Sequence, residues 1–103
     1  MDKTAVDQAA VKYWEQYFSE YGEMWVRDIP RRIKSAMTRS AELKAKSVNG
    51  ILKPLAKKRA EDGTLSIEAA FTGKIDDKIA KVLVTTSFDK AGKMLQFEAH
   101  QVA

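Results

Sequence analysis

The chain contains no cysteine and only one histidine, His100, in 103 residues. Without cysteine it has no disulfide bonds, thiolate zinc sites, iron–sulfur clusters or cysteine nucleophiles. A single histidine leaves a metal site or a catalytic triad without the partners that it needs. The five glycines are scattered singly, so the sequence has no glycine-rich phosphate loop. We therefore expect no catalytic residues, no metal and no cofactor.

Long apolar runs are also absent. No stretch approaches the roughly 18 residues of a membrane span, and residues 1–20 lack the uninterrupted apolar segment of a signal peptide. The expected location is therefore cytoplasmic, without membrane contact. Apolar residues at 45% and charged residues at 31% are ordinary for a folded protein. The length predicts a single domain over 1–103, with a helical half at about 4–60 and a sheet half at about 64–102.

The first half of the chain has helical periodicity. Apolar and aromatic residues recur at three- and four-residue spacing, which predicts an amphipathic helix over 5–21 whose apolar stripe continues toward Pro30. Because proline lacks an amide hydrogen, Pro30 is expected to end this helix and to occupy the first turn of a second one that begins near Asp28. A third, short helix is predicted over about 51–60.

The second half changes to a period of two residues after Asp62-Gly63, which predicts β-strands. Two turns are expected, one at Asp76-Asp77 and one at 91–92. The first turn pairs four residues of one strand with four of the next: Leu65, Ile67, Ala69 and Phe71 with Phe88, Thr86, Val84 and Val82. The second turn pairs three of these with the last strand: Phe88, Thr86 and Val84 with Leu95, Phe97 and Ala99.

Both hairpin registers place the same apolar residues on one face of the sheet, and such agreement between independent patterns supports the assignment. We therefore predict an α+β fold in which two to three N-terminal helices pack on a C-terminal three-stranded antiparallel meander. The apolar face of the sheet is expected to be covered by the aromatic side chains of the first helix, Tyr13, Trp14, Tyr17 and Phe18. The opposite face is expected to display Ala70, Leu83, Met94 and Val102.

Positive charge is concentrated in one third of the chain. Residues 27–59 contain 11 of the 18 basic side chains and only two acidic ones, Asp28 and Glu42, so the segment carries a formal charge of +9 within a chain of +4. Such a local positive field favours a polyanionic partner, above all nucleic acid, because neutralising phosphates releases condensed counterions.

The sequence therefore suggests a small, non-catalytic nucleic-acid-binding protein that contacts phosphates through a basic helical patch. No motif that reads bases is visible. The residues expected to make these contacts lie on the predicted second and third helices and between them: Arg31, Arg32, Lys34, Arg39, Lys46, Lys53, Lys57, Lys58 and Arg59.

Three other features have plainer structural interpretations. Strand alternation places His100 on the solvated face, where we expect it to have no partner. The Asp76-Asp77 pair lacks the ligand spacing of a calcium loop and is typical of a turn. The aromatic residues at 13–25 resemble a surface on which bases stack, but the acidic polar side of their helix would repel phosphate, so we favour core packing.

Two other functions remain open. A lysine-rich face is often only a solvated surface, and the same basic segment also suits docking on an acidic protein surface. In that case the protein would be an assembly subunit or a small inhibitor of the kind that mobile elements encode. A less favoured alternative is an accessory subunit of an enzyme. The outer sheet face or a free edge strand would suit a homo-oligomer.

Overall fold

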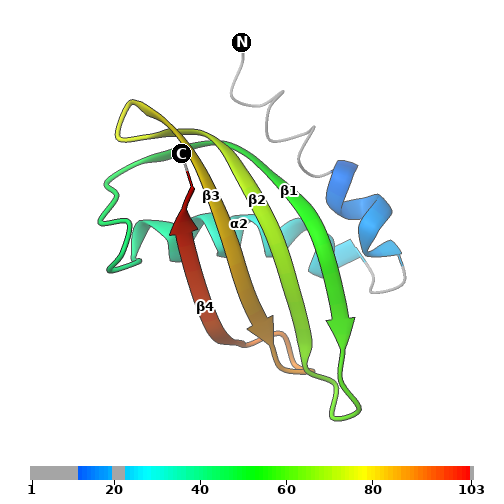
Figure 1. Cartoon of the computed structure of the whole chain (residues 1–103). Helices are drawn as coiled ribbons and strands as arrows, with labels where there is room; N and C mark the ends of the chain where they lie inside the picture. The colour runs from blue at the N-terminus through cyan, green and yellow to red at the C-terminus, as the bar shows by residue number, and fades with distance from the viewer. Residues whose placement is uncertain (1–11, 20–22, 103) are drawn as a thin grey trace.

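A single antiparallel sheet forms most of the structure. The computed structural model describes residues 12–19 and 23–102. Figure 1 shows helix α2 crossing one face of the curved sheet, whose strands lie in the order β1-β2-β3-β4. The elements are a short helical segment over 12–17, α2 (Glu23–Thr38), β1 (Val48–Arg59), β2 (Leu65–Ile75), β3 (Lys78–Phe88) and β4 (Met94–Gln101).

The predicted three-stranded meander with a third helix is wrong, because the segment assigned to that helix is strand β1. This strand pairs with β2 along its whole length, from Val48 opposite Ile75 to Arg59 opposite Leu65. Pro54 is tolerated because β1 is an edge strand with a bulge between Pro54 and Ala56. Pairing with β2, the next strand along the chain, thus outweighs the weak local helical pattern.

Pro30 does not break the helix, contrary to the prediction. Helix α2 begins at Glu23 rather than near Asp28 and contains Pro30 in its interior. The helix buries Ile29, Pro30 and Ile33, and burial of large aliphatic side chains, at about 1.5–3 kcal/mol each, offsets the roughly 3 kcal/mol cost of an internal proline. Of the helix predicted over 5–21, the described part is helical at 12–17.

The first predicted hairpin register is confirmed. Leu65, Ile67, Ala69 and Phe71 lie opposite their predicted partners on β3. The turn between these strands has left-handed backbone at Asp76 and Asp77, with φ of 50° and 68°. Such a two-residue turn matches the twist of antiparallel strands.

The second hairpin register is confirmed only in part. Val84 lies opposite Ala99 and Thr86 opposite Phe97, as predicted. A bulge between Ser87 and Phe88 then places Met94, rather than Leu95, opposite Phe88. Leu95 is therefore not a core residue, and 56% of its surface is exposed. Met94 turns to the side of the sheet that α2 covers, where it packs against the core.

The core lies between the helices and the inner face of the sheet, which is the face toward α2. Trp14 and Phe18 are fully buried, and their rings stack with centroids 5.5 Å apart. The indole N–H of Trp14 donates a hydrogen bond to the carbonyl of Leu52 on β1, at 3.1 Å. Tyr13 was expected in this layer but is 47% exposed. The first helix is thus anchored to β1, the strand that the sequence did not reveal.

Candidate functional site

The nine predicted phosphate contacts do not share one surface. Arg31, Arg32 and Lys34 lie on α2, and Arg39 follows directly after it. The other five lie in the following loop or on strand β1: Lys46, Lys53, Lys57, Lys58 and Arg59. Because side chains alternate along a strand, the four basic residues of β1 point to opposite faces of the sheet. A continuous basic face on two helices is therefore not formed.

Lys57 has a structural role, because its side chain contacts Tyr17 and Phe18. Its Nζ donates a hydrogen bond to the carbonyl of Tyr17 at 2.6 Å, near the end of the first helical segment. The same ammonium group lies 5.1 Å from the ring centroids of both Tyr17 and Phe18. A cation in this position satisfies a helix-terminal carbonyl and is attracted by the aromatic rings. The pKa of the Tyr17 hydroxyl is raised above its ordinary value of 10.0. Burial is the larger cause, and the negative charge of Glu68 is the smaller one.

The remaining basic residues of β1 and its preceding loop are dispersed. Lys53 pairs with Ala70 and Lys58 with Ser66, which places both lysines on the outer face of the sheet, away from α2. Arg59 pairs with Leu65 on the inner side. The exposed Lys46 lies in the loop before β1, where its backbone N–H donates to the Asp76 carboxylate at 2.8 Å. These cations therefore do not converge on one ligand position.

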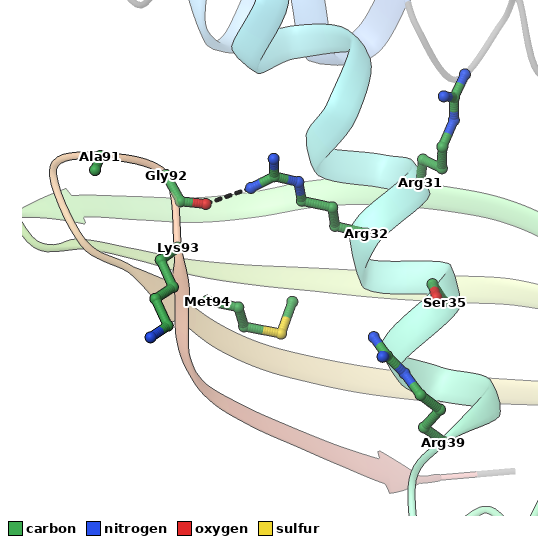
Figure 2. A pocket seen from close by; sticks show the side chains of 8 residues that line it. All are labelled: Arg31, Arg32, Ser35, Arg39, Ala91, Gly92, Lys93 and Met94. Carbon is green, nitrogen blue, oxygen red and sulfur yellow. Dashed lines mark hydrogen bonds between the residues drawn. The ribbon is translucent and has the colours of Figure 1, made fainter.

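A groove does gather cations between α2 and the hairpin that joins β3 to β4. Arg31 and Ser35 on α2 and Arg39 directly after it are spaced four residues apart and form one stripe, which spans about 12 Å at the helical rise of 1.5 Å per residue. Figure 2 shows Met94 between the helix and the hairpin. The groove has a volume of about 590 Å³ and is lined by Arg31, Arg32, Ser35, Arg39, Ala91, Gly92, Lys93 and Met94.

Hydrogen bonds hold the hairpin wall of this groove. The Asp89 carboxylate accepts the backbone N–H groups of Ala91 and Lys93, each at 2.9 Å. Gly92 has φ of 93°, which suits glycine in this tight turn. The guanidinium of Arg32 then donates to the Gly92 carbonyl, as Figure 2 shows. Arg32 thereby links α2 to the hairpin. Because α2 carries Arg31 and the hairpin carries Lys93, this contact fixes the positions of these cations relative to each other.

The charge of the groove suits an anionic ligand. Four of its lining residues are cationic and none is acidic: Arg31, Arg32, Arg39 and Lys93. Guanidinium groups match the geometry of phosphate oxygens, and Met94 adds an apolar surface beside them. Sequence reasoning missed Lys93 because it lies outside the basic segment at 27–59, and it placed Met94 on the opposite face because it paired β3 with β4 without a bulge. Only the hairpin register and the bulge at Leu95 on β4 bring them to α2.

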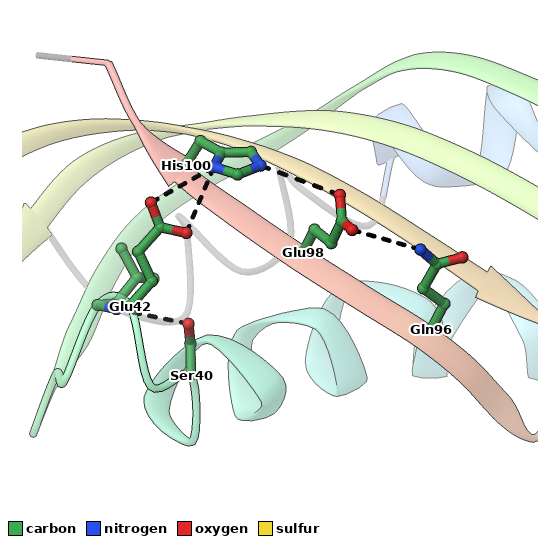
Figure 3. A network of polar contacts seen from close by, with 6 residues as sticks. Ser40, Glu42, Gln96, Glu98 and His100 are labelled. Atoms are coloured by element: carbon green, nitrogen blue, oxygen red, sulfur yellow. Dashed lines mark hydrogen bonds and ion pairs between the residues drawn. The ribbon is translucent and has the colours of Figure 1, made fainter.

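His100 lies outside this groove and, contrary to expectation, has partners. Figure 3 shows its imidazole between two carboxylates, with Nδ1 3.3 Å from Glu42 and Nε2 3.9 Å from Glu98. The side chain of His100 is nevertheless 61% exposed, and exposed pairs contribute little stability. The cluster connects the loop after α2 to the outer side of β4.

Other kinds of site receive no support from the described part of the chain. Over residues 12–19 and 23–102, no group of three or more histidine and carboxylate side chains is placed to hold a metal ion. Among the same residues, no helix has the length and apolar character needed to cross a membrane.

No family model matches the chain, and no curated protein or solved structure shows significant similarity to it.

Proposed function

We propose that the protein is a small, non-catalytic nucleic-acid-binding protein that holds a phosphate backbone in the groove between α2 and the β3–β4 hairpin. The observation that carries this proposal is the convergence of four cations, without a carboxylate, on one groove. Of the nine residues expected from the sequence, Arg31, Arg32 and Arg39 line this groove, and Lys93 joins them.

The expected binding is independent of base sequence. The arginine and lysine side chains could contact a guanine edge, but the groove has no asparagine or glutamine to read adenine and no aromatic side chain to stack a base. Neutralising four phosphates on B-form DNA would give a slope of log affinity against log salt of about −3.6. Affinity should therefore depend strongly on salt and weakly on sequence.

The test compares two pairs of cations on opposite faces. Arg31→Gln with Arg39→Gln removes two charges from the groove, and Lys53→Gln with Lys58→Gln removes two from the outer sheet face. Binding of fluorescently labelled single-stranded and duplex oligonucleotides is measured by anisotropy over a salt series. The groove pair should weaken binding and flatten the salt slope by about 1.8, while the outer-face pair should leave both close to wild type.

Equal losses from the two pairs would show that overall charge, and not the groove, attracts nucleic acid. Unchanged binding in the groove pair, or no binding by the wild type, would reject the proposal. Capture of an acidic protein by the wild type, with loss in the groove variant, would then support docking on an acidic protein surface.

A further inference from the structure

The outer face of the sheet carries an apolar surface that nucleic-acid binding does not use. On β3 it displays Ile79 and Leu83, which are 80% and 44% exposed. Ile51 on β1 and Val102 after β4 are also exposed, and both lie in the row of Lys81. We call Ile51, Ala70, Ile79, Leu83 and Val102 the outer apolar patch. A group of exposed aliphatic side chains on one face is typical of an interaction surface.

The charges around this patch are separated along the strands. Lys81 lies two residues before Leu83 on β3, on the same face. Thr85 lies two residues after Leu83, and its cross-strand partners are the carboxylates Glu68 on β2 and Glu98 on β4. Leu83 therefore lies midway between a cation and a position flanked by two anions.

On β2, β3 and β4 this arrangement is self-complementary, whereas Lys53 on β1, which lies in the row of Leu83, would meet the same residue of the second copy. A two-fold axis that runs across the strands at Leu83 exchanges the row of Lys81 with the row of Thr85. It would place the ammonium of Lys81 between Glu68 and Glu98 of a second copy, and would do so twice. At the axis, Leu83 would meet the same residue of the second copy. Isologous interfaces have this property, since one surface must match itself.

We infer that two copies of this chain pack face to face through their outer sheet faces, with Leu83 and Ala70 of the outer apolar patch at the centre. The rows from Ile79 to Ser87 span eight residue steps, or about 26 Å, and four strands span about 19 Å. The face thus offers about 500 Å² per copy and about 1,000 Å² in total. That area reaches the lower limit of a specific interface.

In the resulting dimer the two sheets would be in contact, and the helices of each copy would lie on the side of its sheet that faces away from the other copy. Both cationic grooves would then remain exposed, on opposite sides of the assembly. The dimer rests on the outer face alone and does not depend on the proposed nucleic-acid binding, so either proposal can fail without the other.

The first test is the mass of the purified full chain, measured by light scattering during size exclusion over a dilution series. The wild type should show the mass of two chains, and Leu83→Glu should reduce it to one because it places two like-charged carboxylates, one from each copy, against each other at the axis. Leu95→Glu is the matched control, since Leu95 is at least as exposed, at 56%, but lies on the β4 bulge outside the patch. Its mass should stay that of two chains. Circular dichroism establishes that each variant is folded.

A charge swap identifies the partner as a second copy. Lys81→Glu should reduce the mass to that of one chain, and adding Glu68→Lys to the same chain should restore two. Restoration is expected only if these positions face each other across the two-fold axis. A wild type that is monomeric throughout the dilution series, a dimer that persists in Leu83→Glu, or no restoration in the double variant would overturn the inference.

Discussion

Helix α2 and strand β1 each contain four basic residues, but they place this charge differently. On α2, positions four residues apart share a face, so Arg31 and the nearby Arg39 reach the same groove. On β1, neighbouring residues point to opposite faces, so Lys57 contacts the core while Lys58 faces solvent on the other side. The density of charge along a chain therefore does not define a charged surface. The period of the secondary structure decides which charges meet.

The largest expected effect concerns the structural role of β1. Trp14→Ala removes a fully buried ring and the hydrogen bond to Leu52, and it should lower the free energy of unfolding by about 3–5 kcal/mol. Tyr13→Ala is the control. The Tyr13 side chain is 47% exposed, so its removal should lower the free energy of unfolding by only about 0.5 kcal/mol. Urea denaturation measures the free energy of unfolding of both variants and of the wild type. Similar losses in the two variants would contradict the anchoring of the first helix on β1.

A smaller effect separates two adjacent lysines of β1. Lys57→Met removes the hydrogen bond to Tyr17 and the cation from the aromatic rings, and it should cost about 2 kcal/mol. Lys58→Met, on the outer face, should stay within about 0.5 kcal/mol of wild type. Urea denaturation gives the stabilities, and anisotropy with labelled DNA should show little change for Lys57→Met. If the two variants were equally stable, Lys57 would be an ordinary surface lysine.

The smallest effect tests the loop that joins α2 to β1. The Asp76 carboxylate accepts the backbone N–H groups of Ser47 and Lys46, which lowers its pKa below the ordinary value of 3.8. A depressed folded-state pKa stabilises the fold above pH 3.8, and this contribution is lost as pH falls through the folded-state pKa.

Asp76→Asn should therefore lower the melting temperature slightly at neutral pH, with a difference from wild type that narrows in acid. Asp77→Asn is matched to it, because Asp77 has the same left-handed backbone in the same turn and accepts no hydrogen bond from the loop. Thermal denaturation from neutral pH to below pH 4 gives the melting temperature of each variant relative to the wild type at each pH. A pH-independent difference for Asp76→Asn would show that the carboxylate charge does not stabilise the loop.

The sequence predicted the β2–β3 register correctly because alternation and a two-residue turn are local signals that agree. It also identified Trp14 and Phe18 as core residues from helical spacing. It failed for Leu95, since the bulge between Ser87 and Phe88 shifts the register by one residue and no residue type announces it. The prediction that Pro30 ends a helix also failed. Burial of Ile29 and Ile33 offsets the free-energy cost of an internal proline, and this burial depends on tertiary packing.

For the candidate site, the sequence alone determined the amount of positive charge, its concentration at 27–59 and the absence of cysteine-based chemistry. Only the tertiary structure decided which cations converge. Strand β1 forms because β2 offers a full-length partner, and that pairing disperses its lysines. The β3–β4 hairpin brings Lys93 to Arg31 and Arg39, which are distant in sequence. Composition is a property of the chain, but a binding surface depends on contacts between distant segments, and local sequence patterns do not encode those contacts.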